Sequence, residues 1–343
     1  GSSVRRYVSL ISVLYMLCFL TAELTAIGAI TSLLSGVNGN LAVLGVAVAT
    51  LIYTTWGGLR ASIVTDQWQA FLLIGLLAIV GFVAMDRLPE LQMADAPSAP
   101  VGSALGVALT LVIAVTAANL FHQGYWQRLW SARDTSALRS GALLGGLVTI
   151  IVVAVVGGLG IAAAMSGADL GSPPIPFFAL LSGAPAWLTI PALVLALTLV
   201  ASSVDTLQNA LASLAVTEKQ GLSIISARWV TVLLMIPVVI VALQGVSVLR
   251  LFLIADLLCA TAVIPVLMGL WKRMTTTAAV FGGLAGLAGA IIPGWVTGGS
   301  LTAGLLAASF PGGIPTLAPF LGALAASAVV SVAITLVWGR NRH

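Results

Sequence analysis

Apolar residues fill this chain in ten long stretches, and no other feature constrains its fold as strongly. A helix needs about 20 apolar residues to cross a hydrocarbon core of about 30 Å, and each stretch approaches or exceeds that length. Charges, prolines and glycines separate the stretches, which run approximately over residues 5–34, 40–57, 64–85, 103–130, 139–165, 187–215, 228–243, 248–270, 276–296 and 317–338. We therefore predict an all-α polytopic membrane protein with about ten transmembrane helices.

The composition excludes a soluble globular domain. Hydrophobic residues make up 60% of the chain and charged residues 7%, and the mean hydropathy is +1.14. Soluble domains carry about 25% charged residues, so this chain has too few charges to cover a surface in water. We expect the lipid bilayer to surround most of it.

The basic residues predict an orientation and not a nucleic-acid partner. The net charge is +4, but the 14 Lys and Arg residues occur in short clusters between apolar stretches and form no basic face. If the N-terminus is cytoplasmic, twelve of them lie inside and only Arg87 and Arg250 lie outside. The positive-inside rule then predicts a multi-pass cell-membrane protein with both ends of this chain in the cytoplasm.

Residues for soluble-enzyme chemistry are scarce. The histidines are His122 and His343, and Cys18 and Cys259 both lie in expected spans. The sequence contains neither a nucleophile elbow nor a phosphate-binding loop. We expect no enzymatic activity, no disulfide framework and no metal centre built from Cys and His.

One expected helix, from Leu199 to Val216, carries a polar face. Its polar residues follow the spacing i, i+3, i+4 and i+7, which puts them on one side: Ser202, Asp205, Thr206 and Asn209. An ionisable residue at bilayer depth costs about 2.5 to 3.5 kcal/mol, so Asp205 needs a partner, a water-filled cavity or a bound cation. Oxygen ligands suit a hard cation, and these residues leave open whether it is Na⁺ or H⁺.

Three further acidic residues lie in or beside expected spans, and each has two interpretations. Asp66 either caps the helix expected over 64–85 or belongs to a site. Glu23 is either a protonated carboxyl bonded to a neighbouring helix or a functional group. Asp256 is either neutral and structural or binds a proton or a substrate.

A second polar cluster lies near the end of the segment 103–130. Its final turns carry an aromatic belt and a basic anchor, namely Tyr125, Trp126, Trp130 and Arg128. The belt does not explain Asn119, His122 and Gln123, which lie deeper. Gly124 permits a break in the helix, and transporters bind substrate at broken helices. We expect Asn119 or Gln123 to contact a substrate.

Two pairs of glycines are spaced for close helix packing. Gly141 with Gly145, and Gly282 with Gly286, follow the small-xxx-small pattern of helix contacts in membranes. We expect both pairs to pack against neighbouring helices.

Four groups of residues along nearly the whole chain carry a family resemblance. They are Gly57-Gly58-Leu59-Arg60-Ala61 through Thr65-Asp66-Gln67-Trp68-Gln69, Gln127-Arg128 with Ser131-Ala132-Arg133-Asp134, Ser202-Ser203-Val204-Asp205-Thr206, and Gly269-Leu270-Trp271-Lys272-Arg273. In order and spacing they resemble the signatures of the sodium/solute symporter family, which includes the sodium/proline and sodium/glucose symporters.

The resemblance implies a leucine-transporter-like bundle, in which five helices are related to the next five by a pseudo-two-fold axis in the membrane plane. It implies that residues 1–86 supply the last three helices of the first repeat. Residues 103–273 form the second repeat, and 274–343 add two helices. The family's first three transmembrane helices are then expected to be missing, and we do not expect this truncated form to transport alone.

The resemblance also implies a sodium site. Paired hydroxyls on the corresponding helix bind Na⁺ in relatives, which assigns this role to Ser202 and Ser203, with the carbonyl of Leu199 as a third ligand. A further sodium position of some relatives corresponds to Asp66 with Ser202, Asp205 and Thr206. This chain has Asp205 and Thr206 where those relatives tend to carry serines, so the carboxylate either strengthens that position or is structural.

The resemblance implies Na⁺-coupled secondary active symport of a small polar solute by alternating access. Asn119 matches a substrate-binding Asn of sugar-transporting relatives, although its shorter distance to Gln127-Arg128 leaves the register near His122 and Gln123 open. We expect Asn119, Gln123, His122 and Asp256 to contact the solute. An amino acid, a sugar, a urea-like solute or a carboxylate all remain candidates. The alternatives are a symporter-like membrane sensor module and a non-transporting structural remnant.

Overall fold

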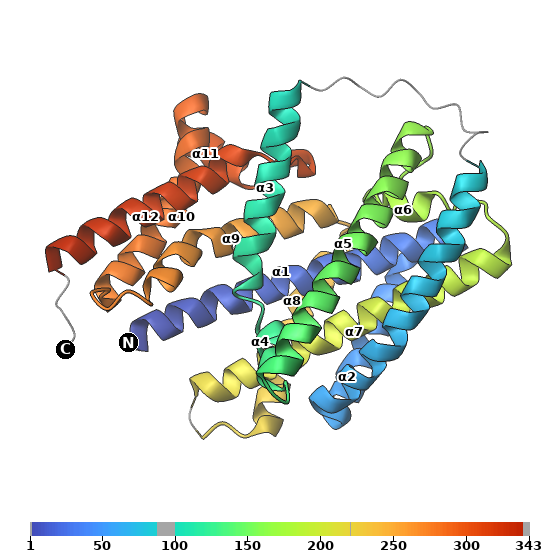
Figure 1. Cartoon of the computed structure of the whole chain (residues 1–343), viewed down its shortest axis with the longest axis horizontal. Helices are drawn as coiled ribbons and strands as arrows, with labels where there is room; N and C mark the ends of the chain where they lie inside the picture. Colours follow the sequence, from blue (N-terminus) through green and yellow to red (C-terminus); the bar gives the residue numbers. More distant parts are fainter. Residues whose placement is uncertain (1, 88–99, 220, 339–343) are drawn as a thin grey trace.

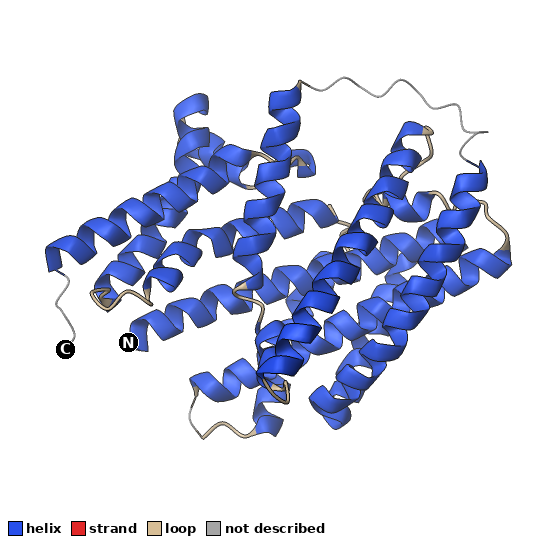
Figure 2. Cartoon of the chain, viewed as in Figure 1, coloured by secondary structure: helices blue, strands red, loops and turns tan. Residues whose placement is uncertain are grey.

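The computed structural model describes residues 2–87, 100–219 and 221–338, with only the backbone given for 55–67 and 83–87. All secondary structure in these ranges is helical, as Figure 2 shows. The elements are α1 (Ser2–Ser35), α2 (Gly39–Arg87), α3 (Val101–Asn119), α4 (Gln123–Trp130), α5 (Thr135–Met165), α6 (Pro176–Ala179), α7 (Ala186–Glu218), α8 (Ile224–Ala242), α9 (Val248–Met268), α10 (Thr276–Gly298), α11 (Leu301–Ala308), η2 (Pro311–Gly313) and α12 (Leu317–Trp338).

Eight of the described helices are long and apolar enough to cross a membrane. They are α1, α3, α5, α7, α8, α9, α10 and α12. Helix α2 adds two shorter apolar stretches, Gly39–Thr54 and Trp68–Phe82. The prediction of an all-α polytopic membrane protein is confirmed.

Helix α2 differs from the sequence prediction. We expected two spans, 40–57 and 64–85, joined by a turn, but the helix is continuous from Gly39 to Arg87. Polar residues and glycines separate the two apolar stretches, but no proline lies between the stretches. A glycine costs a helix only about 1 kcal/mol, so the helix continues through this region. Residue 66 therefore lies inside a helix and caps no N-terminus, and the Asp66 side chain lies outside the described residues.

The segment 103–130 is broken, as the glycine near its end permits. Helix α3 ends at Asn119 and α4 begins at Gln123, and His122 caps α4 by accepting a hydrogen bond from the Tyr125 N–H. The backbone bonds in the connecting turn run from Phe121 to the carbonyl of Ala118 and from His122 to that of Asn119. The break places two buried residues, Phe121 and His122, in the turn between the two helices.

Helices α1, α7 and α9 form the interior of the bundle. In Figure 1, α1 (blue) lies between α9 (orange) and α7 (yellow), and it packs against both. In an apolar 18-residue stretch of each helix, 56% of the residues of α1 and 61% of those of α9 are buried, against 11% of those of α5. Helix α5 therefore lies at the periphery, and the three interior helices hold the polar residues away from lipid.

Glycine contacts join α9, α10 and α12. A side chain added at Gly289 would meet the carbonyl of Gly322, and one at Gly286 would meet the backbone of Thr261. The packing prediction for Gly282 and Gly286 is confirmed. It is wrong for Gly141 and Gly145, because no described atom lies within 4 Å of a β-carbon built at either residue of this peripheral helix.

We expect Gly289→Val to destabilise the chain and Gly145→Val to leave its stability nearly unchanged. Overpacking a close helix contact costs about 1–3 kcal/mol, whereas the Gly145 site is open. Both variants place the same β-branched residue in a helix, so their difference isolates packing. Thermal unfolding of the purified protein in detergent measures it, and equal midpoints for the two variants contradict the α10–α12 contact.

Candidate functional site

A cavity of about 360 Å³ lies beside the polar face of α7, and we call it the α7 cavity. Helices α1, α2, α4 and α7 supply its walls together with the turn at His122, and the lining residues are Phe19, Gln69, Ala70, Leu73, His122, Tyr125, Arg128, Leu199, Ser202, Ser203 and Thr206. Four of the six residues expected to bind sodium are among them. The break before α4 and the polar face of α7 therefore meet at one hollow.

Ser203 connects this cavity to a carboxylate of α1. Its hydroxyl donates to Oε1 of Glu23 over 3.1 Å. A serine oxygen that donates its proton to a carboxylate keeps its lone pairs for a cation. The partner predicted for Glu23 on a neighbouring helix is thus a hydroxyl of the expected sodium site.

Asp205 is buried, with 2% of its surface exposed, and two hydroxyls bond to it. Tyr53 of α2 donates to Oδ2 over 2.8 Å, and Thr206 donates to Oδ1 over 3.3 Å. The Tyr53 oxygen also lies 3.0 Å from the carbonyl oxygen of Ala201. Asp205 thus has the hydrogen-bonding partners that its depth requires, and it does not line the α7 cavity.

Arg128 binds to the same part of α7. Its Nη2 donates to Oγ1 of Thr206 over 3.0 Å, and its Nη1 lies 3.5 Å from the carbonyl oxygen of Gly124. Gly124 makes this approach possible, because a β-carbon there would lie 2.6 Å from the Thr206 methyl group. The hydroxyl of Thr206 thus links the guanidinium of Arg128 to the carboxylate of Asp205. The sequence indicated only a membrane anchor at Arg128.

His122 lies at the break with its ring inside an aromatic cluster. It stacks on Tyr125 with ring centroids 3.9 Å apart, and it contacts Tyr15 and Phe19 edge to face. Its Nδ1 accepts the hydrogen bond of the helix cap, which leaves Nε2 as the proton-bearing nitrogen. His122 therefore lines the cavity as an oriented neutral ring.

The other residues expected to contact a solute do not line the α7 cavity. Asn119 is exposed at the end of α3. Gln123 points to α1, where its Nε2 lies 3.5 Å from Oγ of Ser12. Asp256 is buried on α9. Of the expected solute contacts, the structure brings only His122 to the α7 cavity.

Two glutamines join α2 to α7, and the sequence analysis did not single out either as a contact. Gln208 is 2% exposed, accepts a hydrogen bond from Thr54 over 3.1 Å and donates to Thr50 over 3.1 Å. Gln69 donates to the carbonyl of Thr198 over 3.0 Å. Two features of the sequence could have indicated the contacts of Gln208. Gln208 lies three residues after Asp205 in an apolar helix, and the threonines of α2 that it contacts are spaced i and i+4, which puts them on one helix face.

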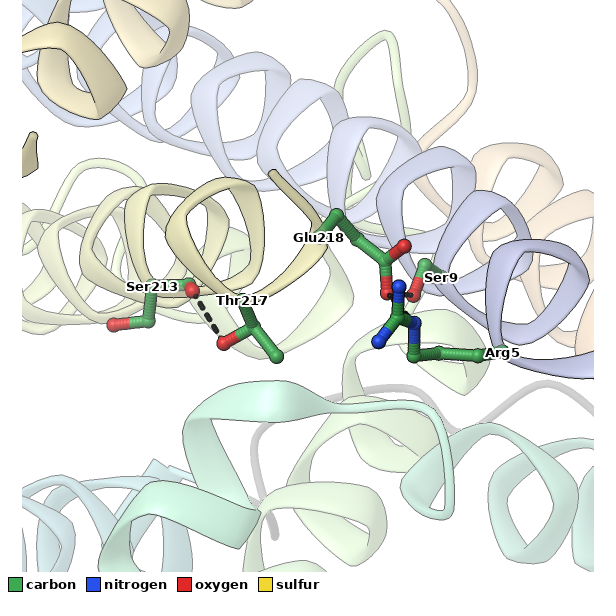
Figure 3. A network of polar contacts seen from close by, with 5 residues as sticks. All are labelled: Arg5, Ser9, Ser213, Thr217 and Glu218. Atoms are coloured by element: carbon green, nitrogen blue, oxygen red, sulfur yellow. Dashed lines mark hydrogen bonds and ion pairs between the residues drawn. The ribbon is translucent and has the colours of Figure 1, made fainter. Parts of the chain in front are cut away.

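A third polar group joins the start of α1 to the end of α7. Figure 3 shows Glu218 accepting a hydrogen bond from Ser9 over 2.7 Å and forming an ion pair with Arg5 at 3.4 Å. Thr217 on the same helix donates to the carbonyl of Ser213 in its own turn. Half-exposed ion pairs contribute about 0–1 kcal/mol, so this group fixes helix ends more than it stabilises the bundle.

A bundle of apolar helices around a cavity lined by hydroxyls and a guanidinium is typical of membrane proteins that handle small polar solutes or ions. No protein-family model matches this chain. The chain is similar to the spermidine transporter DUR31 of Candida albicans, with 30% identity over 309 residues. The match covers 87% of this chain and 59% of that protein, so the chain spans about three fifths of its relative. By its name, this relative is a membrane transporter.

We expect Tyr53→Phe to lower stability by about 1 kcal/mol, because it removes a hydrogen bond to a buried carboxylate at a partly exposed position. Tyr125→Phe is the matched control, since none of the hydrogen bonds described for the chain uses its hydroxyl. Thermal unfolding in detergent compares the two. Equal loss in both variants contradicts the role of Tyr53 as a partner of Asp205.

Proposed function

We propose that this chain forms the transport bundle of a sodium-coupled secondary active transporter for a small polar solute. The observation that carries the proposal is that Leu199, Ser202 and Ser203 line one cavity at the break between α3 and α4. The similarity to a membrane transporter supports the class of function. The family resemblance of the sequence supports the coupling by sodium.

The proposed sodium ligands are the hydroxyls of Ser202 and Ser203 and the carbonyl of Leu199. Oxygen atoms of this kind are the ligands that a hard cation prefers. Glu23 adds a carboxylate beside them through its bond to Ser203. A site of hydroxyl and carbonyl oxygens with one adjacent carboxylate suits a monovalent ion that must bind and leave.

The further sodium position at Asp66, Ser202, Asp205 and Thr206 stays a prediction. We propose a different role for Asp205 and Thr206, because Arg128 donates to the Thr206 oxygen and two hydroxyls bond to the carboxylate. A guanidinium at a ligand oxygen repels a second cation. In the proposed function Asp205 therefore balances the charge of Arg128.

We propose a small organic cation of the polyamine class as the solute. The relative is named for spermidine, and two carboxylates of this chain are not paired with Arg128: Glu23, partly buried on α1, and Asp256, buried on α9. Separated ammonium groups need separated acceptors. His122 and Asp256 stay candidate solute contacts, while amino acids, sugars, urea-like solutes and carboxylates are the competitors to test.

We expect the double variant Ser202→Ala, Ser203→Ala to raise the sodium concentration for half-maximal binding of radiolabelled spermidine by at least about tenfold. That change corresponds to about 1.4 kcal/mol of lost ion binding. The measurement uses the purified chain in lipid nanodiscs at fixed pH. Selectivity among competing solutes should stay the same, because the hydroxyls hold the ion.

Thr217→Val is the control for this test, since its hydroxyl donates to the carbonyl of Ser213 within α7 and Thr217 does not line the α7 cavity. Sodium dependence that persists unchanged in the double variant removes Ser202 and Ser203 from the ion site. Binding that ignores sodium but changes with pH, and that Glu23→Gln makes independent of pH, replaces sodium by a proton on Glu23.

A further inference from the structure

A second cavity of about 490 Å³ lies between α4, α7 and the start of α8, and we call it the Arg228 cavity. It shares no lining residue with the α7 cavity. Small-molecule sites typically enclose about 300–1,000 Å³, so this cavity has room for a polar headgroup. Its polar lining comes from Gln127 and Ser131 of α4, Asn209 and Ser213 of α7, and Arg228 of α8.

The polar lining of this cavity favours an anion. Arg228 brings a guanidinium, and the other four polar side chains each have an N–H or O–H to donate. None of the described residues that line the cavity is acidic. Helices α4 and α8 contain no acidic residue, and the two carboxylates of α7, Asp205 and Glu218, form hydrogen bonds with α2 and α1. A guanidinium beside hydroxyl and amide donors matches the oxygen atoms of a phosphate.

Exposed apolar side chains place the cavity beside lipid. Trp130 and Ile224 line it and are 85% and 49% exposed, and Trp229, next to Arg228 in the sequence, is 65% exposed. Large apolar side chains on the outside of a membrane bundle contact lipid, and tryptophan is enriched at the depth of the headgroups. The rim of the cavity therefore suits a ligand with a polar head and an apolar tail.

The distribution of basic residues predicts which leaflet this cavity faces. Lys219 and Arg228 flank the connection between α7 and α8, which the positive-inside rule assigns to the cytoplasm. Anionic lipids are concentrated in the cytoplasmic leaflet, and basic pockets between transmembrane helices on that side bind anionic headgroups. The expected orientation thus brings the guanidinium to the leaflet that supplies such lipids.

We propose that the Arg228 cavity binds the phosphate of an anionic phospholipid headgroup. The guanidinium of Arg228 donates to phosphate oxygens. The hydroxyls of Ser131 on α4 and Ser213 on α7 donate to the oxygens that remain, and the acyl chains extend past Trp130 into the bilayer. A lipid held in this way contacts three helices and links α8 to α4.

The first test removes the charge from the cavity. Fluorescence anisotropy measures the binding of a fluorescent short-chain phosphatidylglycerol to the purified chain in a nonionic detergent. We expect Arg228→Gln to weaken this binding about tenfold, the effect of a lost hydrogen bond between charged groups. Arg139→Gln is the matched control, because Arg139 is exposed on the peripheral helix α5 and does not line the cavity. Unchanged affinity in Arg228→Gln, or an equal loss in both variants, overturns the proposal.

The second test adds a charge, so that misfolding cannot imitate the expected result. Ser213→Lys brings a second cation to the lining and should tighten the binding about fivefold, because one Lys beside anionic lipid contributes about 1 kcal/mol. Ser140→Lys, exposed on α5, controls for the change in net charge. Affinity that does not rise in Ser213→Lys, or that rises equally in Ser140→Lys, contradicts binding in this cavity.

The third test identifies the source of the phosphate. Phosphatidylcholine should bind more weakly than phosphatidylglycerol, because its choline group is repelled by the guanidinium. Inorganic phosphate at constant ionic strength should displace the fluorescent lipid only at far higher concentrations than unlabelled phosphatidylglycerol does. Equal affinity for the two lipids overturns the preference for an anionic lipid, and displacement by phosphate as effective as by lipid assigns the cavity to a soluble ligand instead. These measurements contain neither sodium nor spermidine, so their failure leaves the proposed transport function in place.

Discussion

Polar groups that lie inside an apolar bundle must bond to one another, and the polar face of α7 is where this requirement organises the structure. Three helices approach α7 through such bonds: α1 through Glu23 to Ser203, α2 through Tyr53 to Asp205, and α4 through Arg128 to Thr206. In the hydrocarbon no water replaces a lost hydrogen bond, so breaking one of these bonds is costly. Each bond therefore holds a helix in position against α7. The cavity lies where these contacts converge.

The charges at this point are arranged in a linked series. The guanidinium of Arg128 donates to the hydroxyl of Thr206, which donates to the carboxylate of Asp205, and Tyr53 donates to the same carboxylate. Hydrogen bonds to charged groups contribute about 1.5–3 kcal/mol each, enough to hold α4 against α7 and little enough to break during a conformational change. Movement of α4 along α7 would break the bond of Arg128, because this bond joins the two helices.

The sequence predicted the parts of this arrangement that depend on local pattern. Apolar length predicted the helical membrane fold, helical spacing predicted the polar face of α7, and Gly124 permitted the break before α4. Contacts between helices depend on the register in which they pack, which spacing within one helix does not contain. For this reason Arg128 was interpreted as an anchor and the partners of Gln208 were missed. Asn119 matched a substrate-binding motif and yet lies exposed at a helix end.

The chemistry along α7 suits the transport function proposed above, because transport requires a surface that both binds and releases its solute. A free carboxylate facing a free cation would hold it too tightly to release, whereas a surface of paired charges and neutral amides and hydroxyls binds weakly at several points. Ser202 and Ser203 belong to this surface, while Asp205 and Arg128 are joined through Thr206. Asp205, the ionisable residue within this polar face of α7, thus balances the charge of Arg128 and leaves the binding of the ion to the uncharged side chains beside it.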